Sequence, residues 1–238
     1  LGTADDARPE DLSELEFIEF WRNISFKTVG TLTNDAATAG VQTILVSLYL
    51  PSSTPEKVFN DSFLDGFLNG FVDACKEVGC AYISGETPEL RTKIYPDRLD
   101  IAGSLFGIVP EGIKPITGKE LSHGDYIVHL ESSGPHENGF TPLRALAESL
   151  KEGYRSKLPS GIEYWRACNA PSKLYTTLVQ DILSQGISVT NIENITGHGW
   201  QKIMRSNKSL KYVIENPLPV PEIFSFYEEK KGVSRKEM

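Results

Sequence analysis

The chain has 238 residues, a formal net charge of −8, 39% hydrophobic residues and 24% charged residues, as is usual for a globular protein able to bury a large core without disulfides. The acidic balance argues against a broad nucleic-acid surface, and no apolar run approaches the ~18 residues that a membrane span needs. Three cysteines without a CxxC pair indicate reduced thiols, so we expect a cytoplasmic protein that binds neither nucleic acid nor membrane.

The first half of the chain alternates between helical and strand periodicity. A phenylalanine or cysteine recurs every four residues from Phe59 to Cys75, which predicts a helix whose aromatic face packs on a sheet. Thr54 is the expected N-cap with Pro55 at the first position, and Gly79 is the expected end. We expect helices over residues 12–21, 24–39 and 54–79, and strands over 43–50, 80–84 and 100–109.

Glycine and proline punctuate residues 110–125 and indicate a domain boundary. We therefore divide the chain into an N-terminal domain, residues 1–112, and a C-terminal domain, residues 113–238. The fold class we expect is α+β. In the second half we expect strands over 126–130 and 211–215, and helices over 142–150, 172–185, 200–205 and 219–231.

One stretch, Ser132 to Phe140, organises the second half of the sequence. Its sequence is Ser-Ser-Gly-Pro-His-Glu-Asn-Gly-Phe, and it stands between an expected strand and an expected helix. Free N–H groups in such a turn and at a helix N-terminus carry partial positive charge, which suits an anion. The simplest alternative is a tight turn whose polar groups satisfy the backbone.

Three further polar motifs lie at the ends of expected elements: Asn34-Asp35, Gly85-Glu86-Thr87, and the segment Thr196-Gly197-His198-Gly199. In this order and spacing the four motifs resemble the phosphoribosylformylglycinamidine cyclo-ligase family, also called aminoimidazole ribonucleotide synthetase. The resemblance is strongest from residue 85 to 146, where Asp100-Ile-Ala-Gly also appears in family order. Residues 170–175 and 221–224 extend it over most of the chain.

The resemblance implies a two-domain α+β fold, with an N-terminal mixed sheet covered by helices on one face and a C-terminal α/β domain. It also implies an ATP- and Mg²⁺-dependent ring closure in purine biosynthesis, carried out by a homodimer. In that reaction the formyl amide oxygen of formylglycinamidine ribonucleotide is phosphorylated, and a neighbouring amidine nitrogen displaces the phosphate. The products are aminoimidazole ribonucleotide, ADP and phosphate.

The same resemblance assigns roles to individual residues. His136 and Asn138 become the catalytic candidates, and a histidine pKa near neutrality would suit proton exchange with the amidine. Carboxylate oxygens suit Mg²⁺, which gives the metal candidates Asp35, Glu86 and Asp100; without the family, each would be an ordinary surface acid. The nucleotide-binding candidates are Gly2, Thr3, Asn34, Asp35, Gly85, Glu86 and Thr87. The substrate-binding candidates are Ser133, Gly134, His136, Asn138, Gly139, Thr196, Gly197 and Gly199.

The chain also departs from the family pattern. Ala4 follows Gly2-Thr3 where the family has lysine, His198 replaces the middle glycine of Thr-Gly-Gly-Gly, and Ser84 replaces the first glycine of Gly-Gly-Glu-Thr. We therefore expect a divergent member represented by an incomplete chain. Two alternatives stay open: another ATP-dependent enzyme of the superfamily, of the thiamine-phosphate kinase or selenophosphate synthetase type, and a catalytically silent nucleotide-binding homologue.

Overall fold

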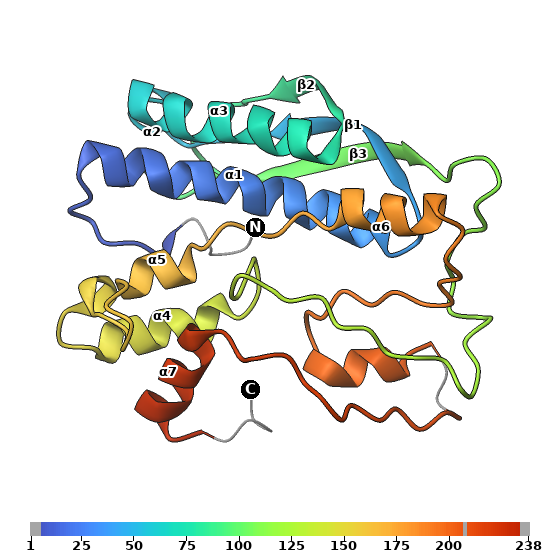
Figure 1. Ribbon diagram of the computed structural model, residues 1–238. Coiled ribbons are helices and arrows are strands. Elements are labelled where there is room, and N and C mark those ends of the chain that lie inside the picture. Colours follow the sequence, from blue (N-terminus) through green and yellow to red (C-terminus); the bar gives the residue numbers. More distant parts are fainter. Residues whose placement is uncertain (1–5, 207–208, 234–238) are drawn as a thin grey trace.

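The computed structural model describes residues 6–206 and 209–233 and has an α+β architecture (Figure 1). Its sheet has the strand order β2-β1-β3. Strand β1 (Gln42–Tyr49) pairs in parallel with β2 (Ala81–Glu86) and antiparallel with β3 (Ala102–Ile108). All three strands fall where the sequence predicts them, and the mixed sheet is confirmed.

One long helix, α1 (Glu14–Ala37), replaces the two that the sequence predicts over 12–21 and 24–39. It begins with a capping box, in which the Ser13 hydroxyl accepts from the Glu16 N–H and the Glu16 carboxylate accepts from the Ser13 N–H. No proline or glycine separates the two periodic stretches, and Asn23 between them lies within the helix instead of capping a second one, so the helix continues. It ends before Gly40, whose φ of +78° turns the chain into β1.

The aromatic helix predicted from Thr54 is two helices, α2 (Pro55–Val58) and α3 (Asp61–Val78). Asn60 caps α3 by accepting from the Phe63 N–H at 2.9 Å, whereas the Thr54 side chain makes no capping bond. Gly79 ends α3 in the left-handed conformation, as predicted.

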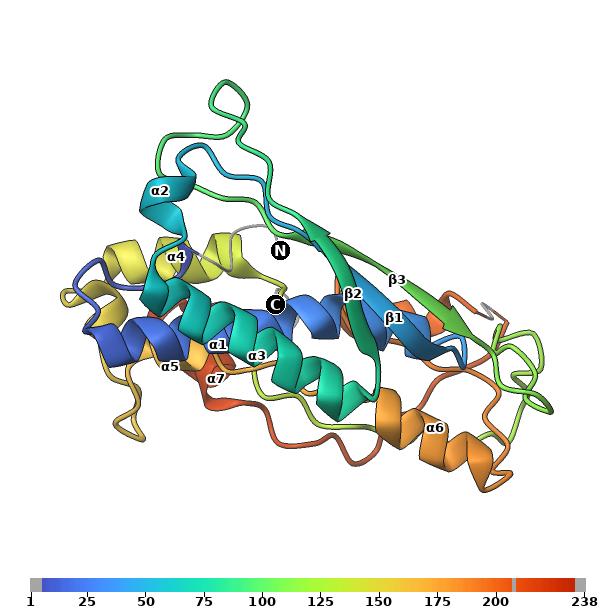
Figure 2. The ribbon, with the colours of Figure 1, turned by 90° about the horizontal axis from the view of Figure 1, so that it is seen from above.

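The phenylalanine face of α3 packs mainly on α1 instead of directly on the sheet. Trp21 of α1 lies with its ring centroid 4.7 Å from that of Phe63 and 6.2 Å from that of Phe67, and the Phe71 ring lies against Tyr82 of β2. Gly66 makes this close crossing possible, because a Cβ there would stand 2.6 Å from the Ile18 carbonyl oxygen. Figure 2 shows α1 and α3 together on one face of the sheet.

The second half of the chain is helical and irregular. Its helices are α4 (Phe140–Ser149), α5 (Tyr164–Cys168), α6 (Thr176–Ser184) and α7 (Glu222–Lys231), with 3₁₀ turns η2 (Gly153–Arg155) and η3 (Gly199–Met204). The strands expected over 126–130 and 211–215 are wrong: within the described ranges neither segment joins a ladder. Tyr126 is 94% exposed and Val128 is 81% exposed, so a short apolar run alone does not produce a paired strand. The described part of the C-terminal half is therefore not α/β.

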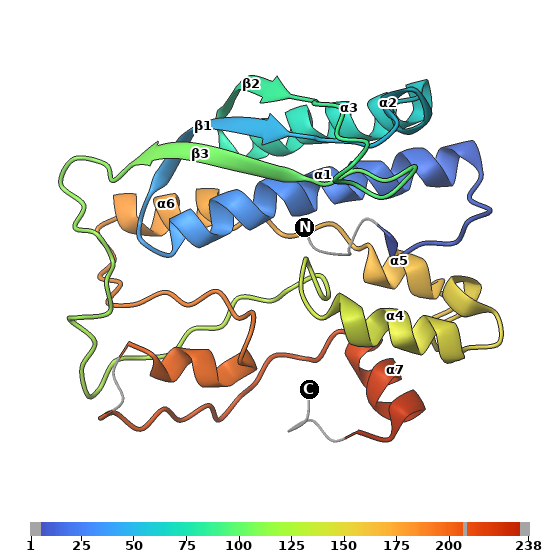
Figure 3. The same cartoon turned by 180° about the vertical axis from the view of Figure 1, so that it is seen from behind.

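A single buried cluster runs through both halves of the chain. It contains Phe20 and Ile24 of α1 together with Trp165 of α5, Leu146 of α4 and Phe226 of α7. Figures 1 and 3 show α4, α5 and α7 on the side of α1 away from α3. The division at residue 112 stays a prediction. No helix in the described residues is long and apolar enough to cross a membrane.

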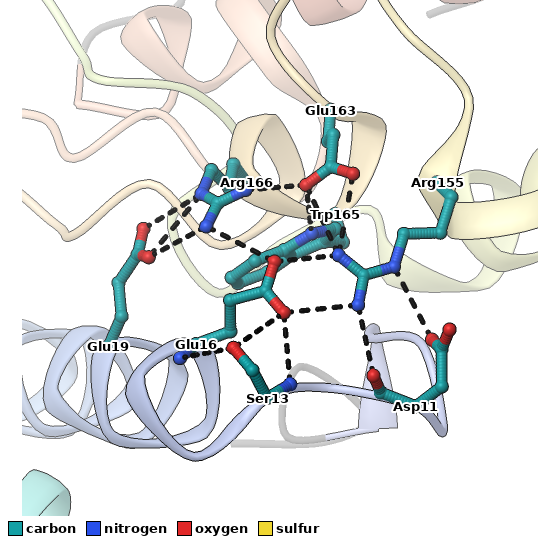
Figure 4. Close-up of polar contacts among 8 residues, drawn as sticks. All are labelled: Asp11, Ser13, Glu16, Glu19, Arg155, Glu163, Trp165 and Arg166. Carbon is teal, nitrogen blue, oxygen red and sulfur yellow. Dashed lines mark hydrogen bonds and ion pairs between the residues drawn. The ribbon is translucent and has the colours of Figure 1, made fainter.

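Two arginines also join the halves through ion pairs (Figure 4). Arg155 donates to both carboxylate oxygens of Glu16, at 2.7 and 3.1 Å, and pairs with Glu163 at 3.4 Å. Arg166 pairs with Glu19 at 3.1 Å. The bonds from Arg155, with a further contribution from the hydrogen bonds of Ser13, lower the pKa of Glu16 from 4.5 to about 2. Because α1 supplies Glu16 and Glu19, the network fixes the second half to the first turns of that helix.

Candidate active site

The stretch from 132 to 140, here called the motif loop, folds as a compact turn that leads into α4. The N-cap of α4 is Gly139, whose φ of +74° is readily adopted by glycine. His136 also has a positive φ, +49°, which is uncommon for a residue with a Cβ. The helix after the loop is confirmed, the strand before it is wrong, and surrounding contacts hold the loop in place.

The motif loop is attached to the segment after α5. The Ser133 hydroxyl donates to the Pro171 carbonyl oxygen at 2.5 Å, and the Ser172 hydroxyl donates to the Glu137 carboxylate. The pKa of Glu137 is raised, mainly because the carboxyl group is buried. The Ser172 hydrogen bond and the positive charge of Lys27 act in the opposite direction. The loop therefore carries a carboxyl group whose pKa is higher than that of a surface glutamate.

His136 is neutral in this fold. Burial, assisted by the positive charges of Lys27 and Lys173, lowers the pKa of His136 to about 4. Its Nε2 atom accepts from the Ser133 N–H at 3.4 Å, and its ring centroid lies 6.2 Å from that of Tyr175. The pKa of His136 therefore lies below the ordinary value from which the sequence argues, and the uncharged imidazole keeps one N–H donor and one acceptor nitrogen with which it can hydrogen-bond a ligand.

Lys27 of α1 lies beneath the motif loop with no exposed surface. Its ammonium group donates to the His136 carbonyl oxygen and, at 3.3 Å, to the Cys168 carbonyl oxygen. It also lies 5.3 Å from the ring centroid of Phe140. Burial lowers the pKa of Lys27 to about 8. A helix residue more than 100 positions away therefore supports the loop.

Asn34 and Asp35 are adjacent in α1 but differ in role. Asn34 is buried, donates to the Lys173 carbonyl oxygen at 2.9 Å and accepts from the Tyr175 N–H at 2.9 Å. Both its polar atoms are thus used in joining α1 to residues 173–175. Asp35 is exposed and accepts from the Asn194 side chain at 2.8 Å.

The Thr196–Gly199 turn lies near Asp35. Lys202 donates to the Asn194 carbonyl oxygen at 2.7 Å and to the Thr196 hydroxyl at 3.1 Å, which closes the turn from below. His198, at the position of the family's middle glycine, has a φ of +74°. The backbone thus keeps a conformation that glycine favours although a histidine stands there. Gly197 and Gly199 have no atom within 4 Å of an added Cβ.

Glu86, Thr87 and Asp100 lie at the opposite end of the sheet, together with Gly85. Glu86 pairs with Tyr49 at the end of β1, and the Asp100 N–H donates to the Pro51 carbonyl oxygen at 2.9 Å. Asp35 comes before the start of β1 in the chain. From Gln42 to Tyr49 the strand has seven residue steps of ~3.3 Å each, so the two ends of β1 are about 23 Å apart. The described residues hold no cluster of three potential metal ligands. Gly2 and Thr3 lie outside the described residues.

A depression of about 350 Å³ lies between α3 and α6; residues 130 and 131, directly before the motif loop, form part of its lining, which includes no residue of the loop itself. Glu131 and Lys173 form an ion pair at its wall, and the Tyr175 hydroxyl donates to the Glu131 carbonyl oxygen at 2.7 Å. Leu130, Leu174 and Leu178 supply apolar surface, and Glu77 completes the lining. Such a size is within the range of small-molecule sites.

Comparison with known proteins finds relatives of the family that the motifs resemble. Residues 13–109 match the family described as "AIR synthase related protein, N-terminal domain". A phosphoribosylformylglycinamidine cyclo-ligase from Oceanobacillus iheyensis is 35% identical over 171 residues, which are 70% of this chain and 49% of the relative. The chain is a divergent member of this family. The cyclo-ligase from Prochlorococcus marinus subsp. pastoris is 26% identical over 233 residues, or 95% of this chain and 65% of the relative.

The chain thus spans about half to two thirds of the length of these curated relatives. Among solved structures, a HypE–HypF complex aligns with a TM-score of 0.58 and 18% identity, covering 89% of this chain and 64% of that one. That likeness supports the fold of the family.

Sequence reasoning missed the buried groups that hold the motif loop. Lys27 looks like one more polar residue of an amphipathic helix, and Glu137 occupies the variable position of the His-x-Asn motif. Ser172 appears in the sequence as the start of an expected helix and as part of the resemblance, with no sign of its contact with Glu137. The one available signal was that Lys27 falls on the face of α1 that also carries Phe20 and Ile24.

Proposed function

We propose that this protein closes the imidazole ring of formylglycinamidine ribonucleotide, using ATP and Mg²⁺, to give aminoimidazole ribonucleotide, ADP and phosphate. The observation that carries the proposal is the motif loop, whose polar residues are held in place next to a depression of ligand size. The family supports the reaction, since the curated relatives bear the cyclo-ligase name. A biosynthetic role and three free cysteines suit the cytoplasm.

The substrate ribonucleotide would lie in the depression, against the motif loop. Lys173 supplies a positive charge for its phosphate, and Tyr175 offers a flat surface beside His136. Neutral His136 would orient the amidine by hydrogen bonding, while Glu137, with its raised pKa, would exchange the proton that the attacking nitrogen loses. Asn138 and Gly139 are exposed at the mouth of the loop and would contact the ribose or the amide.

ATP would bind at the Glu86 end of the sheet. Glu86 is the last residue of β2 and Asp100 lies two residues before β3, on either side of the end of β1, so two strand spacings, about 10 Å in all, separate their backbones. Their carboxylates fit Mg²⁺, which would neutralise phosphate charge during transfer. Thr87 follows directly and offers a hydroxyl and an N–H. Because Asp35 lies at the other end of β1, a Mg²⁺ ion bound to Glu86 and Asp100 could also contact an Asp35 only if that Asp35 belonged to a second copy of the chain.

A homodimer would supply that second chain. The face of the sheet opposite α1 carries Phe106, Ile108 and Tyr49, which are 60, 46 and 39% exposed. No described element lies over it in Figures 2 and 3. Exposed apolar surface of this kind is typical of an interface. We expect Phe106→Lys to give a monomer in sedimentation velocity, and Leu15→Lys, on exposed α1 surface, to leave the dimer intact. A Phe106→Lys dimer would contradict this arrangement.

The test is an assay of the full-length protein with formylglycinamidine ribonucleotide and Mg-ATP, following ADP and aminoimidazole ribonucleotide together. We expect both products, and at least a 100-fold loss in Glu86→Gln and in His136→Ala. The exposed Glu56→Gln and His123→Ala are matched controls and should keep wild-type rates. ADP formed only with another acceptor would indicate a different enzyme of the superfamily, and nucleotide binding without turnover would indicate a silent homologue.

A further inference from the structure

Lys27 is an unusual buried residue. It has no exposed surface, yet no carboxylate within the described ranges lies within ion-pair distance of it. Its ammonium group instead donates to two backbone carbonyl oxygens, those of His136 and Cys168, which come from different segments of the second half. Burying a cation is costly unless it is paired and hydrogen-bonded, and Lys27 has hydrogen bonds without an ion pair. The role of these two hydrogen bonds therefore requires an explanation.

Two of the titratable groups that face Lys27, Cys168 and His136, are uncharged. The Cys168 thiol stays neutral, because burial raises its pKa to about 12, and His136 is neutral because its pKa is about 4. Burial lowers the pKa of Lys27 and the negative charge of Glu137 opposes this effect, while the Phe140 ring centroid lies 5.3 Å from the ammonium nitrogen. The two carbonyl oxygens therefore provide most of the direct polar contact.

The backbone at His136 shows what the contact achieves. His136 has a φ of +49°, a conformation that costs energy for a residue with a Cβ and persists only where neighbouring contacts enforce it. Lys27 holds the carbonyl oxygen of that same residue. The carbonyl bond and the Ser133 contact on the ring together fix both ends of His136.

We propose that Lys27 is the positioning residue of the motif loop: its ammonium group holds His136 in the left-handed conformation that turns the imidazole and Asn138 toward the substrate. The inference rests on the proposed function only in naming the substrate. The mechanical role, a lysine on α1 that sets the conformation of a loop 109 residues away, stands on the hydrogen bonds alone.

The experiment compares wild type, Lys27→Met and the control Lys57→Met, all in the full-length protein. Methionine fills the same volume but cannot donate, and Lys57 is an exposed lysine of α2. Hydrogen exchange is followed by mass spectrometry for peptides covering 132–140 and, as a reference, 63–75 of α3. We expect Lys27→Met to speed exchange in the motif loop at least tenfold and to leave α3 and the control unchanged.

Two further readouts separate positioning from general stability. In wild type, motif-loop exchange corrected for its intrinsic pH dependence should rise above pH 8, as Lys27 loses its proton, and Lys27→Met should lack that rise. This titration needs no variant and so survives a failure of Lys27→Met to fold. In turnover, Lys27→Met should raise KM for the ribonucleotide at least tenfold with KM for ATP within twofold.

The proposal is overturned if loop exchange in Lys27→Met matches wild type, or if the loop and α3 loosen together, which would make Lys27 a general core residue. If wild type does not turn over the ribonucleotide, the proposed function fails, yet the exchange measurements still decide the role of Lys27.

Discussion

Arg155 joins the two halves of the chain, and its removal gives a measurable change in stability. Lowering the pKa of Glu16 from 4.5 to about 2 corresponds to about 3 kcal/mol of preference for the ionised folded state. The Glu16 side chain is 19% exposed, and screening by solvent reduces this to about 1–2 kcal/mol. We expect Arg155→Met to lower the free energy of unfolding by that amount at pH 7.

The direction of this pKa shift determines how the free energy of unfolding depends on pH. A carboxyl whose folded pKa is depressed stabilises the fold above its unfolded pKa, near 4.5, and loses this contribution as the pH falls toward 2. Urea unfolding of wild type at pH 7, 5, 4 and 3 should therefore show a decline that is shallower in Arg155→Met. The control is Arg22→Met, which removes an exposed pair with Asp73 at 2.9 Å and should lower the free energy of unfolding less than Arg155→Met does. Equal losses in the two variants, or parallel pH profiles, would refute the reasoning.

Two other changes test the placement of single residues by urea unfolding. Asn34→Ala removes both hydrogen bonds that the amide makes and should cost about 1–3 kcal/mol, while Asp35→Ala should change stability by less than about 0.5 kcal/mol; similar values for both would contradict the different roles assigned to them. Gly66→Ala places a methyl group against the Ile18 carbonyl oxygen and should lower the free energy of unfolding by about 1–3 kcal/mol. Asn69→Ala, at an exposed position of the same helix, should be nearly neutral. If Gly66→Ala were tolerated equally well, α1 and α3 could move apart at this crossing.

Much of the N-terminal half could be predicted from the sequence because its signals are local. The phenylalanine repeat, Gly79 and the apolar strand at 43–50 each specify an element through periodicity or backbone conformation, and each is found. The partner of the phenylalanine face could not be predicted, since helix–helix and helix–sheet contacts use the same apolar stripe. The small residue that decides it, Gly66, has meaning only once α1 lies across it.

The C-terminal half and the candidate site were harder for a different reason. Residues 126–130 form a short apolar run like that of a strand, but a strand needs a hydrogen-bonding neighbour, and local sequence carries no information about one. Likewise, Lys27 and Glu137 acquire their shifted pKa values from burial against residues more than 100 positions away. The motif loop was identifiable because its glycines and polar residues lie close together in the sequence.

The most direct test of the central claim follows one oxygen atom. The full-length protein is incubated with Mg-ATP and formylglycinamidine ribonucleotide that carries ¹⁸O in the formyl group, and the released phosphate is analysed by mass spectrometry. If the formyl oxygen is phosphorylated and then displaced, each phosphate carries one ¹⁸O atom, and aminoimidazole ribonucleotide appears in equal amount. Phosphate without ¹⁸O, or ADP formed without the ring-closed product, would contradict the account.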